Sequence, residues 1–586
     1  MAYLKSVGVR VTETDLTPIV QATSASIGAY VGHFNWGPCD SPTNVNSEST
    51  LGQIFGFPQK QTISQNDTTA SFLTAASFLK YGDNLKVIRC VGIDAKNAKG
   101  VASEVSGSTG PITSTALFKN ENLFNNLIQG DDVDGVFYAR FPGIKGNSLA
   151  VKIYHIDNSH KIQGLPDNEN ENLLECKSNF TYLPETTDWG TQNNYENDEI
   201  HVMVIDIDGE ITGTKNSILE RWEGLSINNE AKLVNGATNY FAEVLNRGSS
   251  YIYVVNAPDL STYEDVGGVI EYSVGTPDSI TQYTFGGGNN GERSTNNVTN
   301  ALDIFDDVEN IDISLLFAEA FILDDAREIN DKVGEVATSR GDCIGFLSAP
   351  LNLYAEGSDA DKLAALIASK EATGTLSSYV VFDSTPVYVY NRYADNYVWI
   401  PACGHMAGLC AYTDEIADAW FSPAGLNRGQ LRGITKLAYN PKQADRDELY
   451  STNINSIMTF PGQGTVLWGD KTGQPRATAF DRINVRRLFN VIQKEIKKAA
   501  RYSLFELNDP FTRAAFKNSI EPFLRDIQGR RGITEFKVVC DETNNGPDIV
   551  DSNQFVASIY IKPARSINFI SLNFVATRTG LSFNEV

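Results

Sequence analysis

The run from Asp481 to Tyr502 most constrains the fold, because its residue pattern predicts a long amphipathic helix. Asp481 is placed to cap the N-terminus, and basic residues near the C-terminus complement the helix dipole. The apolar face consists of Val485, Leu488, Phe489, Ile492, Ile496 and Ala499. Within an arc of roughly 60° on the opposite side fall Arg487, Lys494, Lys498 and Arg501. The helix is therefore expected to pack by one face and to expose cations on the other.

Charge is segregated along the chain. Residues 471–537 contain 15 Lys and Arg against 7 Asp and Glu, whereas the whole chain of 586 residues carries a net charge of -24. A basic helix face suits an acidic protein partner, and a solvated face without a partner is the alternative. Nucleic acid is disfavoured as a partner, because the acidic remainder of the chain would repel phosphates.

Length and composition set further bounds. A chain of 586 residues is expected to form several domains. No apolar run has the length of a membrane span, and the first residues lack the apolar segment of a signal peptide, so folding in a cytosol is expected. Seven scattered cysteines argue against a disulfide framework and for reduced, buried thiols.

The centre of the chain reads as an α/β layer structure. Strand patterns at Ile313–Phe317, Cys343–Leu347 and Tyr379–Phe382 alternate with helical patterns at Asp324–Ser339 and Asp359–Ala372. The overall prediction is an α+β chain of several domains, with an α/β core made from the middle and C-terminal parts. The predicted parts are an N-terminal arm (1–20), a first part of the inner region (21–94), an inserted, surface-exposed β-rich domain (95–200), a second β-rich domain (201–300), the α/β core (301–470), its basic C-terminal part (471–565) and a C-terminal arm (566–586).

Both ends of the chain look like strands without a local partner. Near the N-terminus Val7, Val9 and Val11 alternate with other residues, as in a half-buried strand. The final strand has apolar residues pointing both ways, which suits a strand covered on both faces. Its apolar residues are Ile567, Phe569, Ile570, Leu572 and Phe574.

Motifs that would indicate chemistry are weak. Phe285–Gly291 is glycine-rich but lacks the Lys-Ser/Thr of a nucleotide-binding loop. Asp206–Gly209 resembles the start of a calcium loop, yet Ser217 stands where a bidentate Glu is required, so a hairpin turn is favoured. One group could be imagined as metal ligands but has no zinc-site spacing, so packing is favoured: Cys403, His405 and Cys410. No enzymatic site, cofactor site or metal site is predicted.

Many short motifs occur in one order along most of the chain. Among them are Gly28–Gly32, Phe34–Pro38, Phe78–Leu85, Ala139–Gly143, Val204–Asp206, Ile211–Thr214, Ile400–Pro401, Pro423–Gly425, Leu467–Gly469 and Ile483–Leu488. Together they resemble the tail sheath proteins of contractile-tailed bacteriophages. The chain departs from the pattern where many members have Ser near 403, Arg near 412 and Asn at 425, which puts only local contacts in doubt.

The resemblance implies a structural subunit of the virion, assembled in the host cytoplasm. It implies stacked rings of the subunit around a tail tube, contacts with baseplate and tail terminator proteins, and contraction by rigid-body rearrangement without nucleotide hydrolysis, nucleic-acid binding or membrane insertion. The cations Arg487, Lys494, Lys498 and Arg501 are then expected to face the tube. The strand arms at the two ends are expected to add to sheets of neighbouring subunits.

Three other functions are weighed against this one. The chain could form the sheath of a phage-derived injection particle, and capsid and portal genes beside its gene would decide against that. A β-rich receptor-binding adhesin would bind glycans or cells through the inserted domain and form no polymers. An enzyme is the least favoured, because no readable site supports it.

Overall fold

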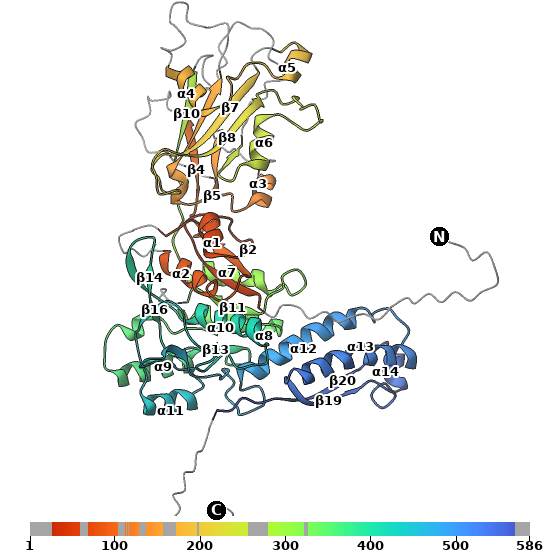
Figure 1. Ribbon diagram of the computed structural model, residues 1–586. Helices are drawn as coiled ribbons and strands as arrows, with labels where there is room; N and C mark the ends of the chain where they lie inside the picture. The colour runs from red at the N-terminus through yellow and green to blue at the C-terminus, as the bar shows by residue number, and fades with distance from the viewer. Residues whose placement is uncertain are drawn as a thin grey trace, which may run out of the picture.

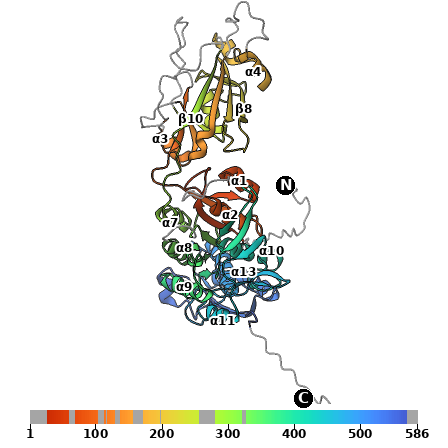
Figure 2. The ribbon, with the colours of Figure 1, turned by 90° about the vertical axis from the view of Figure 1, so that its left-hand side faces the viewer.

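The computed structural model describes residues 26–58, 68–102, 112, 114, 116–127, 136–155, 171–195, 198–255, 279–320 and 326–568. The fold is mixed α/β, with a core on a six-stranded sheet and a separate seven-stranded sheet above it (Figure 1). We call the seven-stranded sheet with its helices, residues 97–286, the distal domain. Residues 483–563 lie beside the core and form the C-terminal hairpin domain. A view turned by 90° again shows the distal domain standing on one end of the core (Figure 2).

The core sheet has the strand order β13-β12-β11-β1-β3-β2, and all neighbours run parallel except β2 and β3. Its strands are β1 (Gly28–His33), β2 (Thr43–Val45), β3 (Leu85–Cys90), β11 (Leu315–Ala318), β12 (Ile344–Leu347) and β13 (Val380–Phe382). Strand β1 is buried throughout, because it has a strand on each side and apolar clusters on both faces. The sheet thus joins chain segments from both sides of the distal domain.

Helices cover both faces of the core sheet. On one face α2 (Thr69–Phe78) and α10 (Cys403–Ile416) pack over Tyr30, and on the other α7 (Thr295–Asp303) and α8 (Ala326–Arg340) pack over Val31. The predicted alternation of strands and helices between 313 and 382 is confirmed. The remaining core elements are α1 (Glu48–Phe55), α9 (Asp359–Ala372), β14 (Val387–Asn391), β15 (Asn396–Ile400), β16 (Ile434–Leu437), α11 (Gln443–Ser451), β17 (Ile457–Phe460) and β18 (Gly464–Leu467).

The distal domain is one antiparallel sheet with the order β8-β7-β6-β10-β4-β5-β9. Its elements are β4 (Asn97–Ala102), α3 (Glu121–Leu127), β5 (Phe137–Pro142), β6 (Leu149–His155), α4 (Glu171–Asn179), α5 (Asp188–Asn193), β7 (Glu199–Asp206), β8 (Ser217–Ser226), α6 (Phe241–Gly248), β9 (Ile252–Val254) and β10 (Ser279–Gly286). The predicted boundary between two β-rich domains at 200/201 is wrong, because it falls inside this sheet. The alternation of apolar and polar residues within a strand does not identify the strand beside it. The sequence therefore did not predict that β6 pairs with β7.

Arg89 ties the distal domain to the core. Its guanidinium is fully buried and donates to the carbonyl oxygens of Phe34 at 2.9 Å, Gly37 at 2.7 Å and Pro142 at 2.7 Å. A fourth bond reaches the side-chain oxygen of Asn290 at 3.3 Å. These acceptors come from the core, from the end of β5 and from the segment that returns to the core, so one side chain holds both crossings together.

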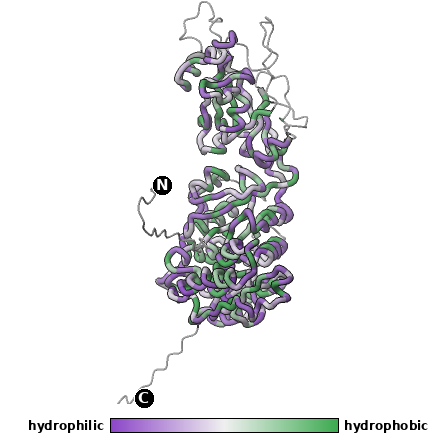
Figure 3. The backbone as a smooth tube through the Cα atoms, turned by 90° about the vertical axis from the view of Figure 1, so that its right-hand side faces the viewer, coloured by the Kyte–Doolittle hydropathy of each residue, from purple (hydrophilic) through white to green (hydrophobic). Residues whose placement is uncertain are grey.

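A second buried cation supports this junction. The Lys145 ammonium donates to the carbonyl oxygen of Phe57 at 3.1 Å, and burial lowers the pKa of Lys145 to about 8. The two crossing segments are also bonded directly, from the Gly92 amide to the Asn290 carbonyl at 3.0 Å. Hydrophobic residues lie both in the core and in the distal domain, on either side of this junction (Figure 3).

The C-terminal hairpin domain contains α12 (Ile483–Arg501), α13 (Pro510–Gly529), β19 (Ile533–Val539), α14 (Pro547–Asp551) and β20 (Ser558–Pro563). The predicted helix between 481 and 502 is confirmed, but Asp481 does not cap it. Arg482 occupies the N-cap position without a side-chain cap. Asp481 lies one residue earlier, where its backbone carbonyl accepts from the Thr472 amide at 3.0 Å. None of the described helices combines the length and the apolar character needed to cross a membrane.

Candidate functional site

The first predicted surface cation, Arg487, is buried. Its side chain is 4% exposed and donates to both carboxylate oxygens of Asp414 on α10, at 2.7 and 2.6 Å. Burial raises the pKa of Asp414, although Arg487 favours its charged form. The expectation of an exposed cation here is wrong, because α10 covers the side of α12 opposite its apolar face. Arg487 therefore fastens α12 to the core.

Lys494 is also held by the core. Its ammonium forms an ion pair with Asp312 and lies 3.3 Å from both the Ile313 carbonyl oxygen and the Ser314 hydroxyl. Only 12% of its side chain is exposed. Two of the four cations predicted to form an exposed stripe on α12, Arg487 and Lys494, are thus bound to the core.

Lys498 and Arg501 lie at the outer end of α12. The Lys498 side chain is 42% exposed, and its ammonium is 3.5 Å from Glu495; Arg501 is exposed. Lys497 beside them is exposed as well. This end of the helix therefore presents a cluster of cations at the surface.

Large apolar side chains follow directly in the connection to α13, which we call the hairpin tip (residues 502–511). Each is at least 61% exposed: Tyr502, Leu504, Phe505, Leu507 and Phe511. Phe505 has a φ of 67°, a left-handed conformation that is unfavourable for a bulky residue. Sequence reasoning missed the hairpin tip, although four large apolar residues, Tyr502, Leu504, Phe505 and Leu507, stand at or directly after the end of the predicted helix. Exposed apolar clusters of this kind mark interaction sites.

The apolar face of α12 packs as predicted. Leu488 and Ile492 join Phe516, Ile520 and Leu524 of α13 in one buried cluster. The hairpin is therefore rigid along its length while its tip is exposed.

The C-terminal hairpin domain also carries a small sheet of two strands, β19 and β20, paired antiparallel. No further strand pairs with either of them in the part of the chain that the structure describes. Of the predicted arm residues only Ile567 falls in that part, and it is 82% exposed. The others lie outside the described residues: Val7, Val9, Val11, Phe569, Ile570, Leu572 and Phe574.

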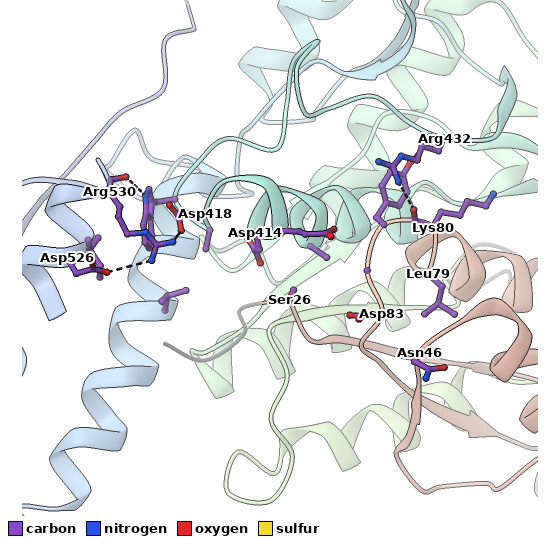
Figure 4. Close-up of a pocket in the computed structure, with 18 of the residues that line it drawn as sticks. Ser26, Asn46, Leu79, Lys80, Asp83, Asp414, Asp418, Arg432, Asp526 and Arg530 are labelled. Carbon is purple, nitrogen blue, oxygen red and sulfur yellow. Dashed lines mark hydrogen bonds and ion pairs between the residues drawn. The ribbon is translucent and has the colours of Figure 1, made fainter. Parts of the chain in front are cut away.

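A cleft of about 820 Å³ separates the core from the C-terminal hairpin domain (Figure 4). Arg530, the residue that caps the C-terminus of α13, pairs across it with Asp418 and lies 3.6 Å from Asp526 of α13. Burial raises the pKa of Asp418. Ser26, the first residue that the structure describes, also lines the cleft. The ion pair of Arg530 with Asp418 thus joins the two bodies across the cleft.

The motifs examined for chemistry serve packing. The Asp206 carboxylate accepts from the amides of Gly209, Ile211 and Thr212 at 3.1, 3.0 and 2.7 Å, so it holds the loop between β7 and β8. A Cβ at Gly288 would lie 2.5 Å from the Gly143 carbonyl oxygen, so the glycine run permits a close backbone crossing.

The third motif lies in α10. Cys403, His405 and Cys410 are buried there, and burial lowers the pKa of His405 to about 3. The His405 ring nitrogen Nδ1 is 3.1 Å from the Tyr81 hydroxyl. Among the described residues, no three His, Cys, Asp or Glu side chains are placed to hold a metal.

Comparison with known proteins identifies the family of the chain. Residues 291–473 match the family model of the phage tail sheath protein central domain, and residues 476–577 match that of the phage tail sheath C-terminal domain. The tail sheath protein of Vibrio phage KVP40 is 32% identical over an alignment that covers 100% of this chain and 99% of the relative. That of Enterobacteria phage T4 is 29% identical with the same coverage.

Two solved structures share the fold at low identity. The sheath tail protein of Listeria innocua has a TM-score of 0.52 at 12% identity and covers 93% of this chain and 96% of its own. That of Desulfitobacterium hafniense has a TM-score of 0.51 at 12% identity, with coverage of 95% and 100%. With a relative above 30% identity along its whole length, the chain belongs to the tail sheath proteins of bacteriophages and is a structural subunit of a contractile tail sheath.

Proposed function

We propose that this subunit polymerises as stacked rings around a tail tube, between a baseplate and a tail terminator, and that assembly takes place in the host cytoplasm. Contraction is a rigid-body rearrangement of subunits that needs no nucleotide and no enzymatic activity. The supporting observation is the contrast along α12, whose inner cations are bound to the core while its outer end presents cations and apolar side chains.

The tube-facing surface is centred on the hairpin tip with Lys498 and Arg501 at its rim. Individual surface charge pairs contribute about 0–1 kcal/mol, so they can separate during contraction and still add up over many copies. Arg487 and Lys494, which were also predicted to face the tube, act indirectly by holding α12 in place. An acidic tube surface with apolar hollows is the partner that fits.

Charge reversal tests this surface. Lys498→Glu with Arg501→Glu should abolish assembly on purified tubes, measured by co-sedimentation and by electron microscopy, and tube-free polymers should persist. The matched control reverses Arg327 and Lys442, whose side chains are 64% and 79% exposed on the core. Equal tube binding by both double variants would exclude the proposed surface.

The arms are proposed to exchange strands between subunits. A two-stranded sheet is marginally stable by itself, so β19 and β20 offer edges to which strands of neighbours can add. Each added backbone hydrogen bond contributes about 1 kcal/mol net, so a strand with several bonds can survive a movement that breaks weaker contacts.

Deletion of residues 1–14 tests strand exchange. The truncated chain should remain a folded monomer by circular dichroism and should fail to form long sheaths. Long contractile sheaths from this truncation would contradict the arm hypothesis and leave the tube-facing surface untouched.

A further inference from the structure

Asp470 lies beside residues 566–568, the last part of the chain that the structure describes. After β20 the chain returns from the C-terminal hairpin domain to the core (Figure 1). There the Ser566 hydroxyl donates to Asp470 Oδ2 at 2.7 Å, and the Asn568 side-chain amide donates to Oδ1 at 3.0 Å. Asp470 itself is 3% exposed, whereas Ser566 is half-buried and Asn568 is exposed.

The same carboxylate binds two other segments. Ser422, in the loop after α10, donates to Oδ2 at 3.1 Å, and Arg482 donates to Oδ1 at 3.3 Å. Arg482 is the N-cap residue of α12, and the Ile483 amide donates to the Asp470 backbone carbonyl at 2.8 Å. One side chain thus connects the root of the C-terminal segment to the start of the helix that bears the hairpin tip.

We propose that Asp470 is a latch: it fixes the point from which the chain beyond Asn568 departs and transmits force on that chain to the core and α12. Bonds to a carboxylate are stronger than neutral ones, and here four of them come from three segments. Without the latch, a pull on the C-terminal segment would act first on β20, which pairs with β19 and packs Ile559 and Ile561 against the apolar cluster of α12 and α13. The role in transmitting force rests on the proposed strand exchange, whereas the latch itself is a property of the monomer.

Limited proteolysis with trypsin tests the latch in the monomer. Arg565 precedes Ser566 and is exposed, and Lys562 is followed by Pro563, which protects the neighbouring bond. Cleavage after Arg565 requires release of the latch, whereas cleavage after Arg578, ten residues beyond Asn568, does not. Asp470→Asn should speed cleavage after Arg565 by roughly tenfold, and Ser566→Ala by roughly threefold, because they remove different numbers of bonds.

The rate of cleavage after Arg578 serves as an internal reference, and Asp551→Asn on α14 is the matched control. Unchanged cleavage after Arg565 in both latch variants, which mass spectrometry would detect, overturns the proposal. Ser566→Ala leaves Asp470 in place, so it still tests the latch if Asp470→Asn impairs folding.

Assembly gives a separate readout. Sheaths of Ser566→Ala should form at normal length and lose subunits when contraction is triggered. Intact contraction together with accelerated cleavage would overturn the force-transmitting role. Loss of sheath formation in the 1–14 deletion, by contrast, reports only on the proposed strand exchange.

Discussion

The core meets its two neighbouring parts through different chemistry. At the distal domain Arg89 and Lys145 are buried cations bonded to neutral oxygens, mostly backbone carbonyls. At the C-terminal hairpin domain the contacts are ion pairs, Arg487 with Asp414 and Arg530 with Asp418, and an open cleft lies between the bodies. Backbone carbonyls cannot be protonated or moved without unfolding, whereas ion pairs can separate into water at the edge of a cleft.

This difference indicates that the contact with the distal domain is less mobile than the contact with the C-terminal hairpin domain. We infer that the distal domain turns together with the core as one body during contraction, and that any adjustment within the subunit occurs at the hairpin domain. Two substitutions challenge this comparison, and a third tests a buried carboxyl of the core itself.

Arg89→Met should have the largest effect on stability. It removes the guanidinium donor from three buried carbonyl oxygens and from the half-buried Asn290 side chain, and each such loss costs about 1–3 kcal/mol, so a total of about 4 kcal/mol or more is expected. Urea unfolding of the monomer measures it, with Arg221→Met on the exposed face of β8 as the control. A loss below about 1 kcal/mol would show that the junction does not depend on this side chain.

Arg487→Met should cost about 3 kcal/mol, because it leaves the buried Asp414 carboxyl without its partner. Unlike the loss of Arg89, this loss can be repaired. The double variant Arg487→Met, Asp414→Leu should return to within about 1 kcal/mol of the original chain, since both charges are then gone. A double variant as unstable as the single one would contradict the distinction between the two contacts.

Asp383 is a buried carboxyl with no cation in ion-pair range among the residues described, and it gives the smallest effect. Burial raises its pKa to about 7 from an ordinary value near 3.8, and Ser348 donates to it. The folded state therefore holds a proton that the unfolded state has lost, so stability falls as pH rises from about 4 through 7. Between pH 6 and 8 the loss should be about 1 kcal/mol, measured by urea unfolding. Asp383→Asn should remove this slope, and an unchanged slope would assign it to other groups.

Periodicity predicted the elements whose partners lie close in sequence or whose patterns are long. The core strands between 313 and 382 and the helix around Leu488 were readable because each depends on a local repeat. The burial of Arg487 could not be predicted, because a helical wheel gives the direction of a side chain and not what covers it. Asp414, its partner, lies 73 residues away.

The candidate surface was predicted in part for the same reason. Lys498 and Arg501 were identified from charge and spacing. The apolar residues of the hairpin tip were overlooked, since exposed and buried apolar runs look alike in a sequence. Their exposure became visible only in the structure, where the contacts between α12 and α13 begin inward of these residues.

The closeness of the two crossings has a consequence for how such a subunit can vary. Gly92 and Asn290 are joined by a single backbone hydrogen bond, so the distal domain leaves and re-enters the core at almost one point. The match to the central-domain family model begins at residue 291, immediately after the return. A short loop could replace everything between these residues without stretching the core sheet. The distal domain therefore lies wholly outside the two segments that match the sheath family models.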